Sequence, residues 1–206
     1  GDSHLLKFTR NGKFIAQYGK AGIHKGAVDD EGLSTYAGDS NDQQNFGRVA
    51  KIFVDPKDNE AYIADGYLNK RVAVLDGDTG KMKRYWGAYG NKPDDRNLGP
   101  YNPDAPPAQQ FRNPVHCADV ATDGFVYVCD RANDRLQVFT KEGKFVKEGF
   151  IAKQTKASGS VWDLAFSRDA QQQYLFVVDG MNSRVWVVLR QTLEVVASFG
   201  DGGRQA

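Results

Sequence analysis

Three side chains in this sequence, Tyr67, His116 and Arg131, are of types that carry out catalysis or binding in proteins. An imidazole can ligate a metal ion, a guanidinium can bind an anion through charge-assisted hydrogen bonds, and a phenol can exchange a proton. Each side chain also has a purely structural interpretation. His116 would then be a hydrogen-bonded polar residue and Tyr67 would pack within its loop. Arg131 would pair with a neighbouring acid, for which Asp119 and Asp163 are the candidates.

Motifs for several other chemistries are missing from the sequence. It has no Gly-rich phosphate loop, no nucleophile elbow and no HExxH zinc motif. Acidic residues at 29–31, 39 and 42 have enough oxygens for calcium, but they lack the spaced Asp-x-Asp-x-Asp-Gly pattern of a calcium loop. We therefore interpret this stretch as a solvated loop.

The elements that must position the three side chains follow from an internal repeat. Each copy has an apolar strand, an Asp, a short polar loop with Asn and Arg, and then a strand in which apolar residues alternate. The copies lie at 61–74, 125–138 and 175–187. Because the Asp, Asn and Arg recur in every copy, we interpret them as residues that satisfy backbone donors in the turn and brace the next strand. Residues that break the repeat are better candidates for chemistry.

Further strands before and after each copy make units of four strands. The expected first strands lie at 50–54, 115–121 and 161–166, and the expected last strands lie at 82–86, 145–148 and 195–199. Half a unit comes earlier, with strands at 5–8 and 14–18. The first two strands of each unit are the most apolar, as expected for strands buried between neighbouring sheets.

This pattern predicts an all-β fold, a single partial β-propeller with about three and a half four-stranded blades, either an open arc or a fragment of a six-bladed ring. The half blade should span 4–19, and the full blades 46–90, 111–151 and 160–200. Long insertions at 23–45 and 91–110 each come before the first strand of a blade, so both should lie on one face. Loops of this length are usually functional or disordered.

The same topology predicts that Tyr67, His116 and Arg131 converge near the central channel. In a propeller, the loop entering the first strand and the loop after the second strand open on the same face. At the position of His116, the neighbouring blades have Lys51 and Trp162. Lys51, Trp162 and Met181 are candidates for the lining of a ligand pocket. We expect Trp162 and Met181 to form an apolar wall of that pocket.

The two cysteines, Cys117 and Cys129, flank a turn almost symmetrically. With a three-residue turn they would face each other across two strands. A cross-strand disulfide is one alternative, but such bonds are usually strained, and two buried thiols are the favoured prediction.

The repeat pattern resembles the NHL repeat over nearly the whole chain, most clearly at 130–145. Within that family, three segments resemble the peptidyl-hydroxyglycine lyase domain of the peptide-amidating enzymes. They are Ala-Asp-Gly-Tyr-Leu-Asn-Lys-Arg at 64–71, Phe-Arg-Asn-Pro-Val-His at 111–116, and Cys-Asp-Arg-Ala-Asn-Asp-Arg at 129–135. Their order and their positions in the blades agree with the lyase domain.

The resemblance implies roles for the three side chains. Tyr67 would be the catalytic base, His116 a zinc ligand, and Arg131 the residue that binds the carboxylate end of the substrate. It also implies zinc and calcium as cofactors of a complete propeller, and it favours a secreted or periplasmic location.

The lyase uses three histidines for zinc, and the two other histidines here, His4 and His24, lie in the half blade and its insertion. The remaining ligands would therefore come from blades outside this sequence. The cysteines that flank the lyase loops are replaced by Leu68 and Val138.

Three functions are consistent with these observations. The first is a propeller that presents a binding face to a small molecule, a peptide or a protein. The second is a truncated, zinc-dependent, lyase-like enzyme, and the third is a structural scaffold. The balance of 27 Lys and Arg against 26 Asp and Glu argues against nucleic acid as a partner, and no apolar run is long enough to span a membrane. An open arc would expose apolar end faces, so we expect either further blades or self-association.

Overall fold

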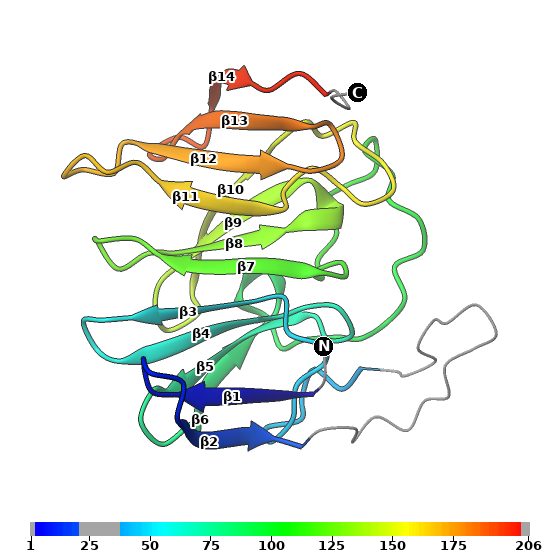
Figure 1. The fold of residues 1–206 in the computed structure, drawn as a ribbon. Helices are drawn as coiled ribbons and strands as arrows, with labels where there is room; N and C mark the ends of the chain where they lie inside the picture. Colours follow the sequence, from blue (N-terminus) through cyan, green and yellow to red (C-terminus); the bar gives the residue numbers. More distant parts are fainter. Residues whose placement is uncertain (1–2, 21–37, 203–206) are drawn as a thin grey trace, which may run out of the picture.

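The computed structural model describes residues 3–20 and 38–202, and all of its sheets are antiparallel. The predicted insertion at 23–45 therefore lies largely outside the described residues, as do His24 and the acidic residues at 29–31. The fourteen strands of the described part form one two-stranded sheet and three four-stranded sheets. Figure 1 shows the sheets side by side, in chain order from the N-terminus to the C-terminus.

Each four-stranded sheet is a blade whose strands pair in sequence order. The half blade contains β1 (His4–Phe8) and β2 (Phe14–Gly19). The first full blade contains β3 (Lys51–Asp55), β4 (Glu60–Asp65), β5 (Arg71–Asp76) and β6 (Met82–Trp86). The second contains β7 (Val115–Val120), β8 (Val126–Asp130), β9 (Arg135–Phe139) and β10 (Phe145–Phe150). The third contains β11 (Asp163–Phe166), β12 (Tyr174–Asp179), β13 (Arg184–Leu189) and β14 (Val195–Phe199).

The prediction of an all-β propeller is confirmed. The strands fall within a few residues of the predicted positions, and the only helical segments among the described residues are 3₁₀ turns at Ala88–Gly90 and Arg131–Asn133. The first strands of adjacent blades contact each other, β3 against β7 and β7 against β11.

The hydrophobic core lies between the blades. One cluster fills the space between the first and second blades and includes Tyr62, Val72, Phe111 and Phe139. A second cluster joins the second and third blades. β4 and β8 are almost entirely buried, whereas β14, on the far side of the third blade, is exposed along its whole length. β4 and β8 agree with the expectation that the first two strands of a blade are buried between neighbouring sheets, whereas the first strand β3 does not, because its first four residues alternate between half-buried and exposed.

The Cys117–Cys129 pair corrects one prediction. The two residues do face each other across β7 and β8, but they form a disulfide bond rather than two thiols. Their Cα atoms are 4.8 Å apart, a separation typical of directly opposed strand residues and within the range that a disulfide can bridge. The bond lies in the core between the second and third blades.

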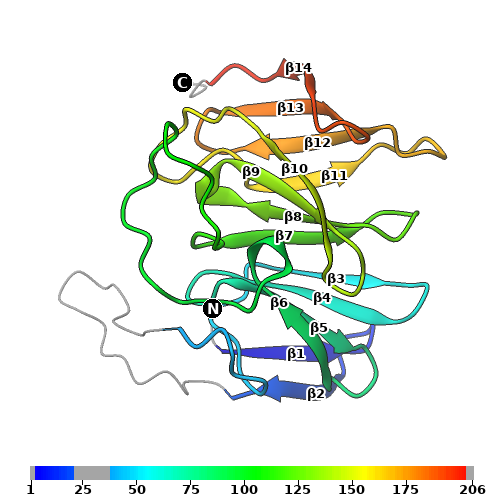
Figure 2. The ribbon, with the colours of Figure 1, turned by 180° about the vertical axis from the view of Figure 1, so that it is seen from behind.

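The loops that matter for function lie at one edge of the sheets. Figure 1 shows the ends of β4 and β8, the start of β7 and the chain between β6 and β7 on the same side, and Figure 2 shows the same segments from behind. The insertion at 91–110 contains no strand or helix and crosses this edge from the first blade to the second.

Candidate functional site

Two buried ion pairs hold the loops that carry the candidate residues. Asp65 accepts hydrogen bonds from Arg71 Nε at 2.9 Å, from Asn69 at 2.8 Å and from the backbone N–H of Gly47. Neither side chain of the Asp65–Arg71 pair is exposed to solvent. The proposed turn-bracing role of the repeated Asp, Asn and Arg therefore agrees with the contacts in the first blade.

The second blade repeats this arrangement. Asp130 accepts from Arg135 Nε and from Asn133, both at 2.8 Å, and from the backbone N–H of Arg112. The third blade departs from it: Asp179 accepts from Trp186 Nε1 and from Asn182, while Arg184 is exposed. The Asp–Arg brace is thus complete only in the two blades that also carry Tyr67 and Arg131.

The structure brings Tyr67 and His116 together. The Tyr67 hydroxyl lies 3.1 Å from His116 Nε2, and the two rings meet edge to face with their centroids 5.7 Å apart. His116 Nδ1 is hydrogen bonded to the backbone carbonyl of Trp162. Because a carbonyl only accepts, Nδ1 must carry the proton. Nε2 is then the acceptor, and the Tyr67 hydroxyl donates to it.

The environment of His116 keeps its imidazole neutral. Burial lowers the pKa of His116, and the positive charge of Arg131 acts in the same direction, against the opposing effect of the Trp162 carbonyl. A neutral imidazole whose Nδ1–H is held by a carbonyl presents a lone pair on Nε2. This is the state in which histidine accepts a hydrogen bond or ligates a metal.

Arg131 completes the cluster, but with the partners of an aromatic stack rather than an acid. Its guanidinium carbon lies 4.7 Å from the centroid of the Trp162 ring and 5.8 Å from that of Tyr67. Within 3–20 and 38–202, no carboxylate forms an ion pair with Arg131, and its buried Nε has no hydrogen-bond partner. Tyr67 itself is 44% exposed, so the cluster is reached from solvent.

The structural alternative for Arg131, a pair with Asp119 or Asp163, is not what the structure has, because Lys51 binds both acids. Lys51 Nζ lies 2.7 Å from Asp119 and 2.5 Å from Asp163. Burial disfavours the charge of Lys51, but the two carboxylates outweigh burial and raise its pKa. This trio joins the first strands of all three full blades and leaves Arg131 unneutralised.

Lys51 also differs from its predicted position. It pairs with Ala64, just as Cys117 pairs with Cys129, so Lys51 is in register with Cys117 rather than with His116. The residues of the neighbouring blades that match His116 are Ala50 and Trp162, since both donate their N–H to the end of the second strand. A one-residue shift between strands moves a side chain to the opposite face, and β7 has an irregularity between Val115 and Cys117.

Of the other pocket candidates, Trp162 lies in the cluster and Met181 does not. Met181 is 49% exposed, and none of the described contacts of the cluster involves it. Trp162 is held by a hydrogen bond from its Nε1 to the carbonyl of Gly159. A Cβ on Gly159 would lie 2.0 Å from the Arg131 carbonyl oxygen, so only glycine allows the Trp162 loop to approach Arg131 this closely.

The described residues do not form a complete zinc site. His116 has the neutral, Nδ1-protonated form of a metal ligand, but its Nε2 accepts a hydrogen bond from the Tyr67 hydroxyl. Catalytic zinc usually has three protein ligands, and His4, the other described histidine, lies in the half blade. Ligand atoms of Cys117, Asp119 and Asp163 lie within 4.8 Å of one another. That group does not fit a metal either, because the Cys117 sulfur is in the disulfide and Lys51 already binds both acids.

Sequence reasoning missed two features of the site. The Trp162 carbonyl, which fixes the His116 tautomer, has no signal in the sequence because a backbone acceptor is independent of residue type. The Lys51–Asp119–Asp163 trio does have a signal. All three residues are charged and fall within the otherwise apolar first strands of three successive blades.

Comparison with known proteins supports the fold and the resemblance to the amidating enzymes. No protein-family model matches the sequence. Peptidyl-glycine alpha-amidating monooxygenases B and A of Xenopus laevis are 31% and 30% identical to it over 109 residues, which is 52% of this chain. The matched part is only 11% and 10% of the length of those two proteins.

Solved structures with the same architecture are more distant in sequence. A catalytically inactive virginiamycin B lyase from Staphylococcus aureus, solved with quinupristin, superposes with a TM-score of 0.54 at 16% identity, and the match covers 98% of this chain and 56% of that one. Kuenenia stuttgartiensis hydrazine synthase gives 0.53 at 17% identity, covering 81% and 39%. The WD40 repeats of RRP9 give 0.51 at 11% identity, covering 74% and 38%. At these identities the likeness is one of fold, and the fold is a β-propeller.

Proposed function

We propose that this chain is part of a propeller that binds the carboxylate end of a peptide, or a similar small organic acid, at Arg131. The observation that carries the proposal is the state of the Arg131 guanidinium. It is stacked on Trp162, its Nε is buried without a hydrogen-bond partner, and no described acid neutralises it. Tyr67 and His116 lie against it and supply a hydroxyl and an imidazole.

The stacking suits carboxylate recognition. An aromatic ring over the face of a guanidinium takes up none of its N–H groups, so a carboxylate at the edge of the guanidinium can accept two parallel hydrogen bonds. The lack of a protein carboxylate means that the ligand does not have to displace one. Because Nε is buried, a carboxylate would bind through the terminal Nη groups of Arg131.

The experiment compares an N-acetylated dipeptide that has a free C-terminal acid with the same dipeptide as its amide, by isothermal titration calorimetry. Charge-assisted hydrogen bonds contribute about 1.5–3 kcal/mol, so we expect the acid to bind about 10- to 100-fold more tightly than the amide. Arg131→Met should abolish this difference. Arg168→Met, at an exposed arginine outside the cluster, is the matched control and should retain it. Equal affinities for acid and amide in the unmodified protein would contradict the proposal.

A second candidate is a zinc-dependent, lyase-like activity, in which Tyr67 acts as base, His116 ligates the metal and Arg131 holds the substrate carboxylate. The orientation of His116 favours it, because Nδ1–H is fixed by a carbonyl and Nε2 faces the cluster. The other ligands would have to come from outside the described residues. Metal analysis of protein purified without chelators tests this candidate: stoichiometric zinc that is lost in His116→Ala would support it, and absence of zinc from the unmodified protein would exclude it.

Two features of the surroundings enter the proposal. The Cys117–Cys129 disulfide favours an oxidising compartment, as for a secreted or periplasmic protein. Mass spectrometry after alkylation without reductant, on protein from its native source, would show two free thiols if this is wrong. No helix in the described part of the chain is long and apolar enough to cross a membrane.

The end faces of the arc also need covering. Apolar side chains are exposed on β1 and β2 at one end and on β14 at the other; they are Leu6, Phe8, Phe14, Ile15, Val195, Val196 and Phe199. We propose that further blades or a second copy of the chain cover these faces. A monodisperse monomer of the 206-residue chain in analytical ultracentrifugation at high concentration would contradict this. If the protein binds neither a metal nor a small ligand, the scaffold function is the remaining alternative.

A further inference from the structure

A second pocket lies beside the Arg131 cluster, beneath the insertion at 91–110. Its volume is about 660 Å³, and its lining includes Leu68, Lys70, Tyr101, Arg112 and Ala132. Leu68 and Ala132 directly follow Tyr67 and Arg131 in the chain, so the pocket and the cluster share the same two loops.

Lys70 is a buried cation that forms no ion pair with an acid of the described residues 3–20 and 38–202. Only 6% of the residue is exposed, and its ammonium group donates to the backbone carbonyl of Arg96. Burial lowers the pKa of Lys70, and this effect exceeds the opposing influence of Asp95 and Asp94. A buried ammonium that has only a carbonyl for a partner is incompletely compensated.

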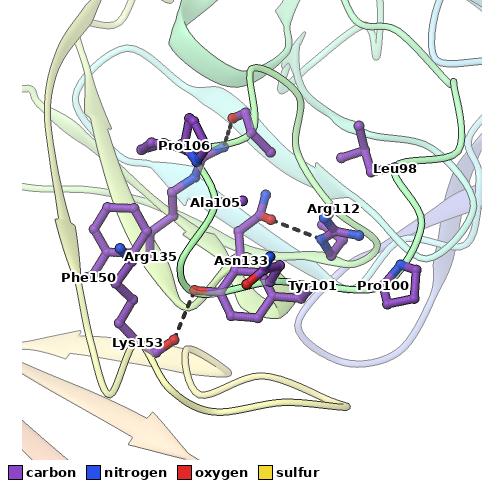
Figure 3. A pocket seen from close by; sticks show the side chains of 13 residues that line it. Leu98, Pro100, Tyr101, Ala105, Pro106, Arg112, Asn133, Arg135, Phe150 and Lys153 are labelled. Carbon is purple, nitrogen blue, oxygen red and sulfur yellow. Dashed lines mark hydrogen bonds between the residues drawn. The ribbon is translucent and has the colours of Figure 1, made fainter.

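Arg112 is another cation of the pocket, which the exposed Lys156 also lines. Its Nε donates to Asn133 at 3.0 Å and its Nη1 to the carbonyl of Gly99, and its guanidinium carbon lies 5.9 Å from the centre of the Tyr101 ring. Figure 3 shows the bond between Arg112 and Asn133 beside the Tyr101 ring. In the part of the chain that the structure describes, no carboxylate pairs with the Arg112 side chain, and burial lowers its pKa.

The neighbouring cavity contains an arginine whose charge is neutralised by carboxylates of the protein. That cavity has a volume of about 190 Å³ and is drawn in Figure 3. Tyr101 and Arg112 line both this cavity and the pocket that contains Lys70. The neighbouring cavity also contains Arg135, which pairs with both Asp130 and Glu148. Arg135 therefore needs no further anion, whereas Arg112 does.

Among the described residues, Asp95 and Asp94 are the acids whose charges act on Lys70. Asp95 lines the pocket, but both of its oxygens accept hydrogen bonds from Ser40, one from the backbone N–H and one from the hydroxyl. Asp94 pairs with Arg96. Asp95 keeps its negative charge and attracts Lys70, but burial and the positive charge of Arg112 outweigh this attraction and lower the pKa of Lys70. Lys70 and Arg112 therefore share one cavity and repel each other. An anion placed between them would relieve this repulsion.

We propose that this pocket is a second oxyanion site, in which Lys70 and Arg112 bind a carboxylate or phosphate group. The oxyanion is either free or an acidic group of the ligand that Arg131 holds. The site is distinct from the Arg131 cluster, because Arg131 is not among the residues that line this pocket.

The test uses inorganic phosphate, titrated at constant ionic strength against matched chloride, with binding followed by calorimetry and by the midpoint of thermal unfolding. We expect saturable binding and a raised midpoint in phosphate. Lys70→Met should abolish the saturable response. Arg131→Met should keep it, which separates failure of this proposal from failure of the carboxylate site at Arg131.

A gentler variant covers the case in which Lys70→Met does not fold. Asn97 is exposed, lines the pocket and accepts a hydrogen bond from Gly99 N–H through its side-chain oxygen. Asn97→Asp keeps that acceptor and adds one negative charge at the rim, so phosphate affinity should fall about three- to tenfold. Asn11→Asp, in the turn between β1 and β2, is the matched control and should leave phosphate affinity unchanged.

The source of the oxyanion is decided by a pair of acetylated peptides with free C-termini that differ only in one upstream Glu or Gln. Tighter binding of the Glu peptide, lost in Asn97→Asp, assigns the site to a side chain of the ligand. Saturable phosphate binding without a difference between the peptides assigns it to a free anion. The proposal is overturned if neither phosphate nor the Glu peptide gives a response beyond its control, or if Asn11→Asp weakens binding as much as Asn97→Asp.

Discussion

The buried Asp–Arg pairs and the Tyr67–His116–Arg131 cluster lie in the same two loops, yet they use their polar atoms in opposite ways. Arg135 donates to Asp130, Glu148, Tyr89 and two backbone carbonyls, and it is fully buried. Arg131, four residues earlier, contacts two aromatic rings, and its guanidinium donates no hydrogen bond to any acceptor among the described residues. Arg135 therefore stabilises the loop, whereas Arg131 is positioned by it.

This difference distinguishes residues that stabilise the fold of a repeat protein from residues that are available to bind a ligand. The repeated Asp and Arg of the first two blades meet the same neighbours in both, and those neighbours satisfy them. A residue that occurs once, such as Arg131 or His116, stands among neighbours that need not complement it. Unpaired charge beside a satisfied scaffold is the arrangement expected of a preorganised binding site.

The largest expected effect is a loss of stability when one of the buried Asp–Arg pairs is broken. Arg135→Met removes one partner of a buried ion pair and leaves Asp130 uncompensated, so the free energy of unfolding should fall by about 3–5 kcal/mol. Arg184→Met, at the same position in the third blade, removes an exposed side chain that does not pair with Asp179 and should cost less than about 1 kcal/mol. Urea denaturation measures both. Similar losses in the two variants would remove the distinction between braced and unbraced blades.

The disulfide gives the next largest effect. It closes the β7–β8 hairpin, which carries His116 at one end and leads into Arg131 at the other. For a separation of 12 residues, the loss of chain entropy in the unfolded state corresponds to about 3 kcal/mol. The double variant Cys117→Ala, Cys129→Ala and the reduced wild type should both lose stability of this order in denaturant. Unchanged stability after reduction, with two thiols verified by mass, would show that the bond does not support the hairpin.

A pH effect of intermediate size comes from Asp134, the acid that ends the Arg131 loop. Burial raises the pKa of Asp134 to about 7, and nearby Asp130 and Asp179 act in the same direction against the N–H of Ser160. The folded state therefore holds a proton that the unfolded state releases near its usual pKa of about 4. Folded stability from this group should fall as pH rises from about 4 to 7 and stay low above that range.

Asp134→Asn isolates this contribution, because the amide oxygen can still accept from Ser160 N–H. We expect the variant to be more stable than the wild type at pH 8 by roughly 1–2 kcal/mol, with the difference shrinking toward pH 5. Thermal unfolding at the two pH values measures it. A constant difference between the variants across this range would show that Asp134 does not titrate there.

The smallest effect on stability is expected at Arg131. Because its guanidinium satisfies no described acceptor, Arg131→Met should change the free energy of unfolding by less than about 1 kcal/mol, the size of a cation–π contact. The same variant should lose the preference for a peptide acid over its amide. A loss of several kcal/mol in urea denaturation would place Arg131 with Arg135, as part of the scaffold.

The architecture was predictable because the same strand and turn pattern occurs three times in the sequence. Strands, turns and the bracing Asp and Arg at 65 and 71, and at 130 and 135, follow from pattern alone. The convergence of Tyr67, His116 and Arg131 was also predictable, since topology brings the two kinds of loop to one face. Their chemical roles stay predictions.

The errors came from choices that depend on a single neighbour. Lys51 was placed in register with His116, but pairing shifts it by one residue and turns it toward Asp119 and Asp163. Pairing with one of those acids was one alternative for Arg131 besides an anion site, and its guanidinium lies over Trp162 instead. The disulfide was discounted on general grounds, although directly opposed positions bring the Cα atoms to 4.8 Å. Register and competition for partners are tertiary properties, and local sequence does not contain them.

The most direct test of the account is a crystal structure of the protein soaked with N-acetylglycine, the smallest ligand that carries a peptide bond and a free carboxylate. We predict a carboxylate with both oxygens within about 3.2 Å of the Arg131 guanidinium nitrogens, and the ligand beside Tyr67 and His116. Electron density for the ligand at another place, with no ligand bound to Arg131, would contradict the claim that Arg131, a residue that breaks the repeat, binds the carboxylate.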